Sequence, residues 1–401
     1  MDAQINIYVI TCNISQGMVF NGKQEDLQII FSYLGKGGYF KRNEKFNLCF
    51  NNMITEIAAI SPQMFQLRKF LNNNVPDGSY FAVTGRKPTP EENNKLVESL
   101  LILNGIVSHE DLRTMDFLYP NYNMYIALGR ERTLIGEERD KTKRTCRFCK
   151  ETYPNTTFDV EAHAISEAFG NKTLICLDEC DVCNAEFGRA DGIETDIISY
   201  FDIDRVMAQV KNKDNNIPKI EFPEYKLSIV DKTINLKFKK QPAKEPSLEL
   251  LNELKEKEYY INLQNIYRAL CKYFVSVASD ELLTHFSDTI SWIKGKKSYS
   301  KLPRVAIATS DHVYQQPTIT YYIRKVEDHH LPFCVAEFRF AQLIISYIVP
   351  FNDGDTCNFL DDGDFNNYWE YMQHYKKLQW NFVDFSDDSK QRYTVKFEYT
   401  K

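Results

Sequence analysis

Four cysteines form two Cys-x-x-Cys pairs, Cys146/Cys149 and Cys180/Cys183, separated by thirty residues. Zn²⁺ takes four thiolate or imidazole ligands at the corners of a tetrahedron, and two such pairs supply them when the chain folds back on itself. A thioredoxin-like redox pair is the weaker alternative, because there are two pairs and neither lies in a βαβ pattern. The spacing therefore predicts a structural zinc site. Cys176 lies outside the spacing and is expected to be a bystander.

The segment TFDVEAHAI, between the two pairs, contains a histidine and alternates in polarity. Alternation with a period of two predicts a strand. Its apolar face would hold Phe158, Val160, Ala162 and Ala164, and its polar face Asp159, Glu161 and His163. Such a polar face suits either a hydrolytic site or a solvated edge. Asn184 directly follows Cys183, so a zinc ion bound there would hold the Asn184 side chain in a fixed position.

Three motifs in order, CRFC, EAHAISEAFGNK and DECDVCNAEFG, resemble the HNH endonuclease family with a four-cysteine zinc site. They are especially similar to a bacterial branch that serves in restriction and anti-phage defence. The resemblance covers about residues 144–205 and implies a ββα-metal fold that hydrolyses DNA phosphodiesters, expected in double-stranded DNA. Cleavage of that kind leaves a 5′-phosphate and a 3′-hydroxyl.

By this resemblance His163 is the general base that takes a proton from water, a role that suits imidazole near neutral pH. Asn184 is a ligand of a catalytic divalent ion, Mg²⁺ or Mn²⁺. Many family members carry a second metal ligand directly before the histidine, where this chain has Ala162. A nearby carboxylate must then serve. Glu161 is preferred, and Asp159 and Asp178 are alternatives.

Two further residues of the resemblance are open to interpretation. Ser166 stands where the family pattern has proline, which is expected to affect turn rigidity rather than chemistry. Asn171 is the only asparagine between His163 and Cys183, and is expected either to tie the loop or to contact metal.

A function of a different class also fits the residues, namely a non-catalytic zinc-stabilised module that binds nucleic acid or a partner protein. Four-cysteine sites often serve only as scaffolds, and Ala162 leaves the metal site one ligand short. RNA as substrate stays open as well, because such a module contacts phosphates more than bases. A nuclease would need restraint in its host, so an activating protein or phage component is expected as a partner.

The wider sequence predicts an α+β chain with a central zinc-stabilised module between two α+β domains. The expected parts are an α/β accessory or sensor domain (1–140), the HNH module (141–205) and a carboxy-terminal domain for DNA binding or regulation (206–401). Thr89, Pro90 and Glu92 predict a capped helix. One helix is expected from Ser279 to Gly295, and a largely antiparallel sheet in the carboxy-terminal part. The charged segment from Gly129 to Lys150 is expected to be a linker.

Bulk composition narrows the classes of function. The chain has 401 residues, 43% of them hydrophobic and 26% charged, with a net charge of -6. An acidic chain has no global attraction to polyanions, so any phosphate-binding site must be local. The basic excess at Arg205–Glu245, ten Lys/Arg against five acids, is one such candidate. No secretory signal or apolar run of membrane length stands out, so we expect a cytoplasmic protein without membrane contact. Assembly into a homo-oligomer stays open.

Overall fold

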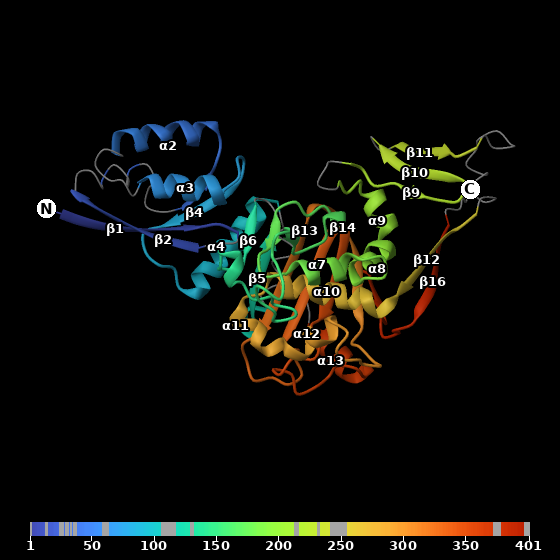
Figure 1. The fold of residues 1–401 in the computed structure, drawn as a ribbon. Coiled ribbons are helices and arrows are strands. Elements are labelled where there is room, and N and C mark those ends of the chain that lie inside the picture. The colour runs from blue at the N-terminus through green and yellow to red at the C-terminus, as the bar shows by residue number, and fades with distance from the viewer. Residues whose placement is uncertain are drawn as a thin grey trace. The chain divides into compact units, whose positions relative to one another are not determined.

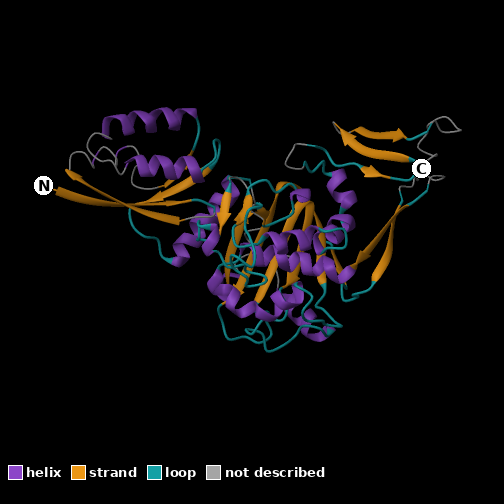
Figure 2. Ribbon diagram, viewed as in Figure 1, coloured by secondary structure: helices purple, strands orange, loops and turns teal. Residues whose placement is uncertain are grey.

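The computed structural model describes residues 2–12, 15–23, 28, 32, 34, 38–57, 64–105, 118–128, 132–211, 216–230, 233–240, 255–371 and 378–396. The chain divides into two compact units, Met1–Asp116 and Phe117–Lys401. Both units mix helices and strands, which confirms an α+β chain (Figure 2). The division falls earlier than the expected boundary at residue 140. The separate roles given to 1–140, 141–205 and 206–401 stay predictions.

The first unit is an antiparallel sheet in the order β2-β1-β4-β3 with helices packed on it. Its strands are β1 (Asp2–Ile10), β2 (Ser15–Lys23), β3 (Gly38–Lys41) and β4 (Tyr80–Thr84), and its helices are α2 (Glu44–Ile57), α3 (Met64–Asn74) and α4 (Pro90–Leu103). The predicted cap of α4 is confirmed. Glu92 N donates to the Thr89 hydroxyl at 3.2 Å, and Thr89 N donates to the Glu92 carboxylate at 2.9 Å.

The second unit centres on a sheet in the order β14-β13-β15, with β5 also paired to β13. The pairings are all antiparallel, as expected. The strands are β5 (Tyr122–Leu128), β13 (Val305–Arg324), β14 (Cys334–Ile348) and β15 (Trp380–Val383). Helix α10 (Leu263–Val277) packs against β13 (Figure 1). Nearly all its side chains are buried, because it lies between this sheet and the cysteine segment.

The helix expected from Ser279 to Gly295 is wrong in its continuity. The segment forms α11 (Asp280–Leu283), a 3₁₀ turn η5 (Thr284–Phe286) and α12 (Ser287–Ile293). The Thr284 hydroxyl donates to the Glu281 carbonyl at 2.7 Å, a local bond that competes with regular helix geometry. Ser279 caps the first piece as predicted, accepting from Leu282 N.

Smaller elements complete the second unit. A three-stranded sheet in the order β11-β10-β9 and a two-stranded sheet β12-β16 share an apolar core that includes Phe222, Tyr225 and Val395. These elements, with the remaining helices, are α6 (Leu118–Asn121), α9 (Asp202–Met207), β9 (Ile220–Glu221), β10 (Tyr225–Val230), β11 (Thr233–Phe238), β12 (Lys257–Asn262), α13 (Asp362–Tyr371) and β16 (Lys390–Val395).

The cysteine segment forms a small sheet followed by helices. Strand β8 is central, paired in parallel with β6 and antiparallel with β7. The elements are β6 (Thr133–Ile135), η2 (Lys141–Lys143), β7 (Ala162–His163), η3 (Glu167–Phe169), β8 (Leu174–Cys176), α7 (Asp181–Gly188) and α8 (Ile193–Tyr200). The described part of the expected linker 129–150 therefore contributes a strand and the first cysteine pair.

The alternating strand expected over TFDVEAHAI is also wrong in extent. Only Ala162 and His163 are paired as a strand, and Val160, predicted on the apolar face, is 59% exposed. The cause is Asp181, at the start of α7. Its carboxylate accepts hydrogen bonds from the Asp159 and Val160 amides at 3.0 and 2.9 Å. A side chain thus satisfies backbone groups that a strand neighbour would otherwise bind.

The cysteine segment shares one apolar core with the carboxy-terminal part of the chain. Phe169, on η3, makes edge contacts with the rings of Phe338 and Phe340 on β14, at centroid distances of 5.3 and 4.7 Å. The same buried cluster includes Ile197 on α8 and Phe274 on α10. The segment therefore folds against α10 and the central sheet.

Candidate metal and catalytic site

The four cysteines of the two predicted pairs come together. Their sulfur atoms all lie within 4.8 Å of one another, and no disulfide joins them. The Cys146–Cys183 and Cys149–Cys180 sulfur distances are 3.8 and 3.7 Å. Zinc–sulfur bonds of about 2.3 Å in a tetrahedron require sulfur–sulfur distances of about 3.8 Å. The cluster could therefore hold a metal ion such as zinc. Cys176 lies outside it, as predicted.

Backbone turns fix both cysteine pairs. The first pair lies in a tight turn in which Lys150 N donates to Cys146 O at 2.9 Å, and Lys150 adopts a left-handed φ of 67°. In the second pair Cys180 is the N-cap residue of α7, and Asn184 N donates to Cys180 O at 2.9 Å. Cys183 therefore lies in the first turn of a helix, where exposed N–H groups favour a thiolate.

One ammonium group contacts the cluster. Lys294, which directly follows α12, donates from Nζ to Cys183 Sγ at 3.3 Å and pairs with Glu186. The contact between the two thiols lowers the pKa of Cys146 and raises that of Cys183. Four thiolates around one Zn²⁺ leave a net charge of −2, which a nearby ammonium partly offsets. This cation comes from the carboxy-terminal part of the chain.

Arg147 joins the first cysteine pair to the end of α10. Its buried guanidinium donates to the carbonyls of Val275 and Ala278 at 2.8 and 3.2 Å, and pairs with Asp178 at 3.1 Å. The last carbonyls of a helix have no partner within the helix and carry a partial negative charge. Arg147 supplies hydrogen-bond donors and a positive charge to these carbonyls, so the turn that carries Cys146 and Cys149 is attached to α10.

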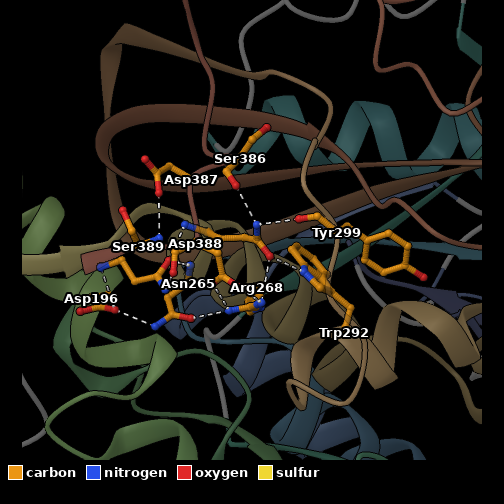
Figure 3. A network of polar contacts seen from close by, with 11 residues as sticks. Asp196, Asn265, Arg268, Trp292, Tyr299, Ser386, Asp387, Asp388 and Ser389 are labelled. Carbon is orange, nitrogen blue, oxygen red and sulfur yellow. Dashed lines mark hydrogen bonds and ion pairs between the residues drawn. The ribbon is translucent and has the colours of Figure 1, made fainter. Parts of the chain in front are cut away.

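The other end of α10 carries a polar network (Figure 3). Arg268 donates to both oxygens of Asp388 at 2.9 and 3.1 Å. Asn265 donates to the buried Asp196 of α8 at 2.7 Å. Since α8 is the next helix after α7, which carries Cys183, both ends of α10 hold the cysteine segment.

His163 has a carboxylate neighbour that the sequence interpretation missed. Its Nε2 lies 2.6 Å from Glu167 Oε1, and the two side chains are 17% and 26% exposed. Glu167 begins η3, and the hydroxyl of Ser166 caps that turn by accepting from Ala168 N. Nδ1 of His163 is buried. The nitrogen that faces the less buried side is therefore Nε2, beside Glu167.

The three carboxylates expected near His163 all lie in ion pairs. Glu161 pairs with Arg132. Asp159 pairs with Lys141 at 3.1 Å, and Asp178 with Arg147. Burial raises the pKa of Asp178, and Arg147 opposes that shift. Ala162 is buried and pairs with Cys176 across β7 and β8, and its methyl side chain has no atom that could bind a metal ion.

The two asparagines differ in role. Asn171 is buried and bonds only the loop around it, donating to Ile165 O and Leu174 O at 2.8 and 3.0 Å and accepting from Thr173 N and Leu174 N. It ties the loop, one of the two roles expected. Asn184 is half-buried in the first turn of α7, one residue past the cluster. Its expected role as a metal ligand stays a prediction.

Three residues that bear on the site were absent from the sequence interpretation: Glu167, Lys272 and Lys294. Glu167 could have been found, because it is a carboxylate four residues after His163 on the same short loop. Lys272 leaves a fainter signal, a charge within the apolar pattern of IYRALCKYFVSVA. Lys294 leaves none, because only the tertiary fold brings it to Cys183.

Comparison with models of protein families, with curated proteins and with solved structures finds no match. Among the helices that the structure describes, none has the length and apolar character needed to cross a membrane.

Proposed function

We propose that the chain is a divalent-metal-dependent endonuclease of the HNH type that hydrolyses DNA phosphodiesters. The observation that carries the proposal is the His163–Glu167 contact of 2.6 Å beside the four-cysteine cluster. A carboxylate close to a histidine stabilises the imidazolium that forms when the ring takes a proton. A scaffold that only binds zinc does not require this pair.

In this proposal Glu167 turns from Nε2 of His163 when the metal ion and substrate bind, and the freed Nε2 then takes the proton of the attacking water. The negative charge of Glu167, which stays close to the ring, stabilises the imidazolium as it forms. The water oxygen bonds to phosphorus while the bond from phosphorus to the 3′ oxygen breaks. That oxygen takes a proton from a solvent water and leaves as a 3′-hydroxyl, and the other product carries a 5′-phosphate.

Two kinds of metal belong to the proposal. Zinc in the four-cysteine cluster would stabilise the fold of the segment. A catalytic Mg²⁺ or Mn²⁺ would supply Lewis-acid stabilisation of the phosphate charge. Since Glu161 is held by Arg132, we assign the missing oxygen ligand to Glu167, together with Asn184.

The setting of the proposal is bacterial defence against phage or foreign DNA, with an activating protein or phage component as partner. Support for this setting comes from the resemblance alone. Such a partner could act on the site through α10. A shift of this helix would move Arg147, beside the first cysteine pair, and Asp196 on α8, because both residues form hydrogen bonds with it.

A non-catalytic zinc-stabilised module that binds nucleic acid or a partner protein is the second candidate. The ion pairs that occupy Glu161, Asp159 and Asp178 favour it, since they leave few carboxylates near His163 for a second metal. In a scaffold the His163–Glu167 pair would be a local structural contact.

Incubation of the purified full chain with supercoiled plasmid separates the two candidates. The nuclease proposal predicts nicked and linear DNA with Mg²⁺ or Mn²⁺, and none when these ions are omitted and the zinc is kept. A parallel RNA substrate tests the nucleic-acid class. DNA retarded in a gel without cleavage, under every divalent ion tried, would favour the scaffold.

A further inference from the structure

Lys272 places an ammonium group at the centre of the site from outside the cysteine segment. Its side chain is 1% exposed and comes from the middle of α10. Nζ donates to the backbone carbonyl of His163 at 3.1 Å and to Glu194 Oε1 at 3.0 Å, and it lies 3.2 Å from Glu179 Oε2. The ammonium therefore donates two hydrogen bonds and forms an ion pair with a third group, Glu179.

The three residues in contact with the ammonium belong to three separate segments. His163 lies on β7, Glu179 directly precedes Cys180, and Glu194 lies in the first turn of α8. The three segments are a strand of the small sheet, the second cysteine pair and helix α8. One buried charge therefore sets the spacing of all three.

The charge on Lys272 is retained in the fold. Burial alone would lower the pKa of this ammonium, but Glu179 and Glu194 outweigh burial and raise it. A buried charge that loses its partner costs several kcal/mol, so an ammonium held by two hydrogen bonds and two carboxylates has little freedom to move. The His163 carbonyl is held with it.

Glu167 and Lys272 contact different ends of the same residue. Glu167 contacts the imidazole of His163, whereas Lys272 binds its main chain. A side-chain contact fixes the rotation of the ring, but the position of the ring also depends on where the backbone lies. Displacement of a reacting group by about 1 Å can cost roughly 100-fold in rate.

We propose that Lys272 is a positioning residue for His163, which makes α10 a structural part of the nuclease site. The inference rests on the proposed function of His163 as a general base. Without the ammonium the imidazole would still be present, but β7 would lose the contact that sets its distance from the second cysteine pair.

The test compares the full-length chain with a triple variant, Lys272→Met, Glu179→Gln and Glu194→Gln. The triple variant removes the ammonium and both carboxylates together, so no unpaired charge stays buried. Its matched control is Glu337→Gln with Arg339→Met, which neutralises another buried ion pair of the same compact unit. Measurements are zinc content, plasmid cleavage, and the NMR signal of His163 in protein labelled at histidine Cε1. The signal is assigned with His163→Gln.

We expect the triple variant to keep its zinc and to lose about 10- to 100-fold in kcat, with KM changed less than about threefold. The His163 signal should shift, while the control keeps its kcat and its His163 signal. A triple variant with the kcat and the His163 signal of the original chain overturns the inference.

Two further outcomes have a defined meaning. If the triple variant loses zinc, Lys272→Arg decides. Arginine keeps the charge, but its planar guanidinium cannot make all three contacts from one nitrogen. We therefore expect a folded protein with kcat at least about fivefold lower. An unchanged kcat overturns the inference. If the original chain cleaves nothing, the nuclease proposal fails. The His163 signal then still reports whether Lys272 positions that residue.

Discussion

Nε2 of His163, on β7, and Oε1 of Glu167, at the start of η3, lie 2.6 Å apart. The same unit holds a second pair at the same distance, between His285 Nδ1 and Asp353 Oδ1. The surroundings separate them. His163 is 17% exposed and lies on the strand between the cysteine pairs, whereas His285 is 46% exposed on the turn before α12. Distance alone therefore does not assign chemistry, and the second pair is a natural control.

Replacement of Glu167 by glutamine should reduce DNA cleavage by roughly 10- to 100-fold. The amide keeps the shape of the side chain but removes the negative charge that would stabilise an imidazolium at His163. Zinc content should not change, because Glu167 does not contribute to the four-cysteine cluster. Initial rates of plasmid nicking measure the effect. An undiminished rate would remove Glu167 from the mechanism.

Zinc should bind at one ion per chain and should be lost in Cys180→Ser. Structural zinc sites of this type contribute on the order of 10 kcal/mol, so loss of a ligand should also lower the thermal midpoint of unfolding. Cys176→Ala is the matched control, since that thiol is buried in the same segment but lies outside the cluster. Metal analysis by mass spectrometry checks both variants. Equal zinc in Cys180→Ser and the original chain would contradict the assignment.

Glu179 should make folding stability depend on pH. Burial raises its pKa to about 7 from an ordinary 4.5, and the attraction of Lys272 only partly opposes this. Between pH 4.5 and 7 the folded chain holds a proton that the unfolded chain releases, so this contribution to stability falls as pH rises. Above pH 7 Glu179 is ionised in the folded chain, and the full free-energy cost of burying its charge lowers the stability.

The variant Glu179→Gln lacks this titration. Its free energy of unfolding, relative to that of the original chain, should therefore increase between pH 5 and pH 8 by up to a few kcal/mol. Urea unfolding at both pH values measures the difference. A relative stability that is constant or decreases over this range would show that Glu179 is ionised throughout.

The cysteine cluster was predictable because zinc ligation depends on residue type and local spacing. Cys146, Cys149, Cys180 and Cys183 need only that the chain fold back once. The cap at Thr89 was predictable for the same reason, since its partners lie within three residues. Local chemistry and short separations made both predictions possible.

The surroundings of His163 were not predictable in this way. The expected strand over TFDVEAHAI followed the polarity pattern, but the carboxylate of Asp181 binds the backbone there instead. Glu161 was preferred for its sequence proximity, yet Arg132 pairs with it from 29 residues away. Lys272 is 109 residues from His163. Contacts of such long separation depend on tertiary packing, which one sequence does not reveal.

The most direct test of the nuclease proposal is the cleavage rate of His163→Ala beside that of His285→Ala, with supercoiled plasmid and Mg²⁺ or Mn²⁺. Both variants remove a histidine that lies 2.6 Å from a carboxylate, so general effects of losing such a pair are matched. We predict a loss of at least about 100-fold for His163→Ala with zinc retained, and an unchanged rate for His285→Ala. Equal cleavage by His163→Ala and the original chain would contradict the account.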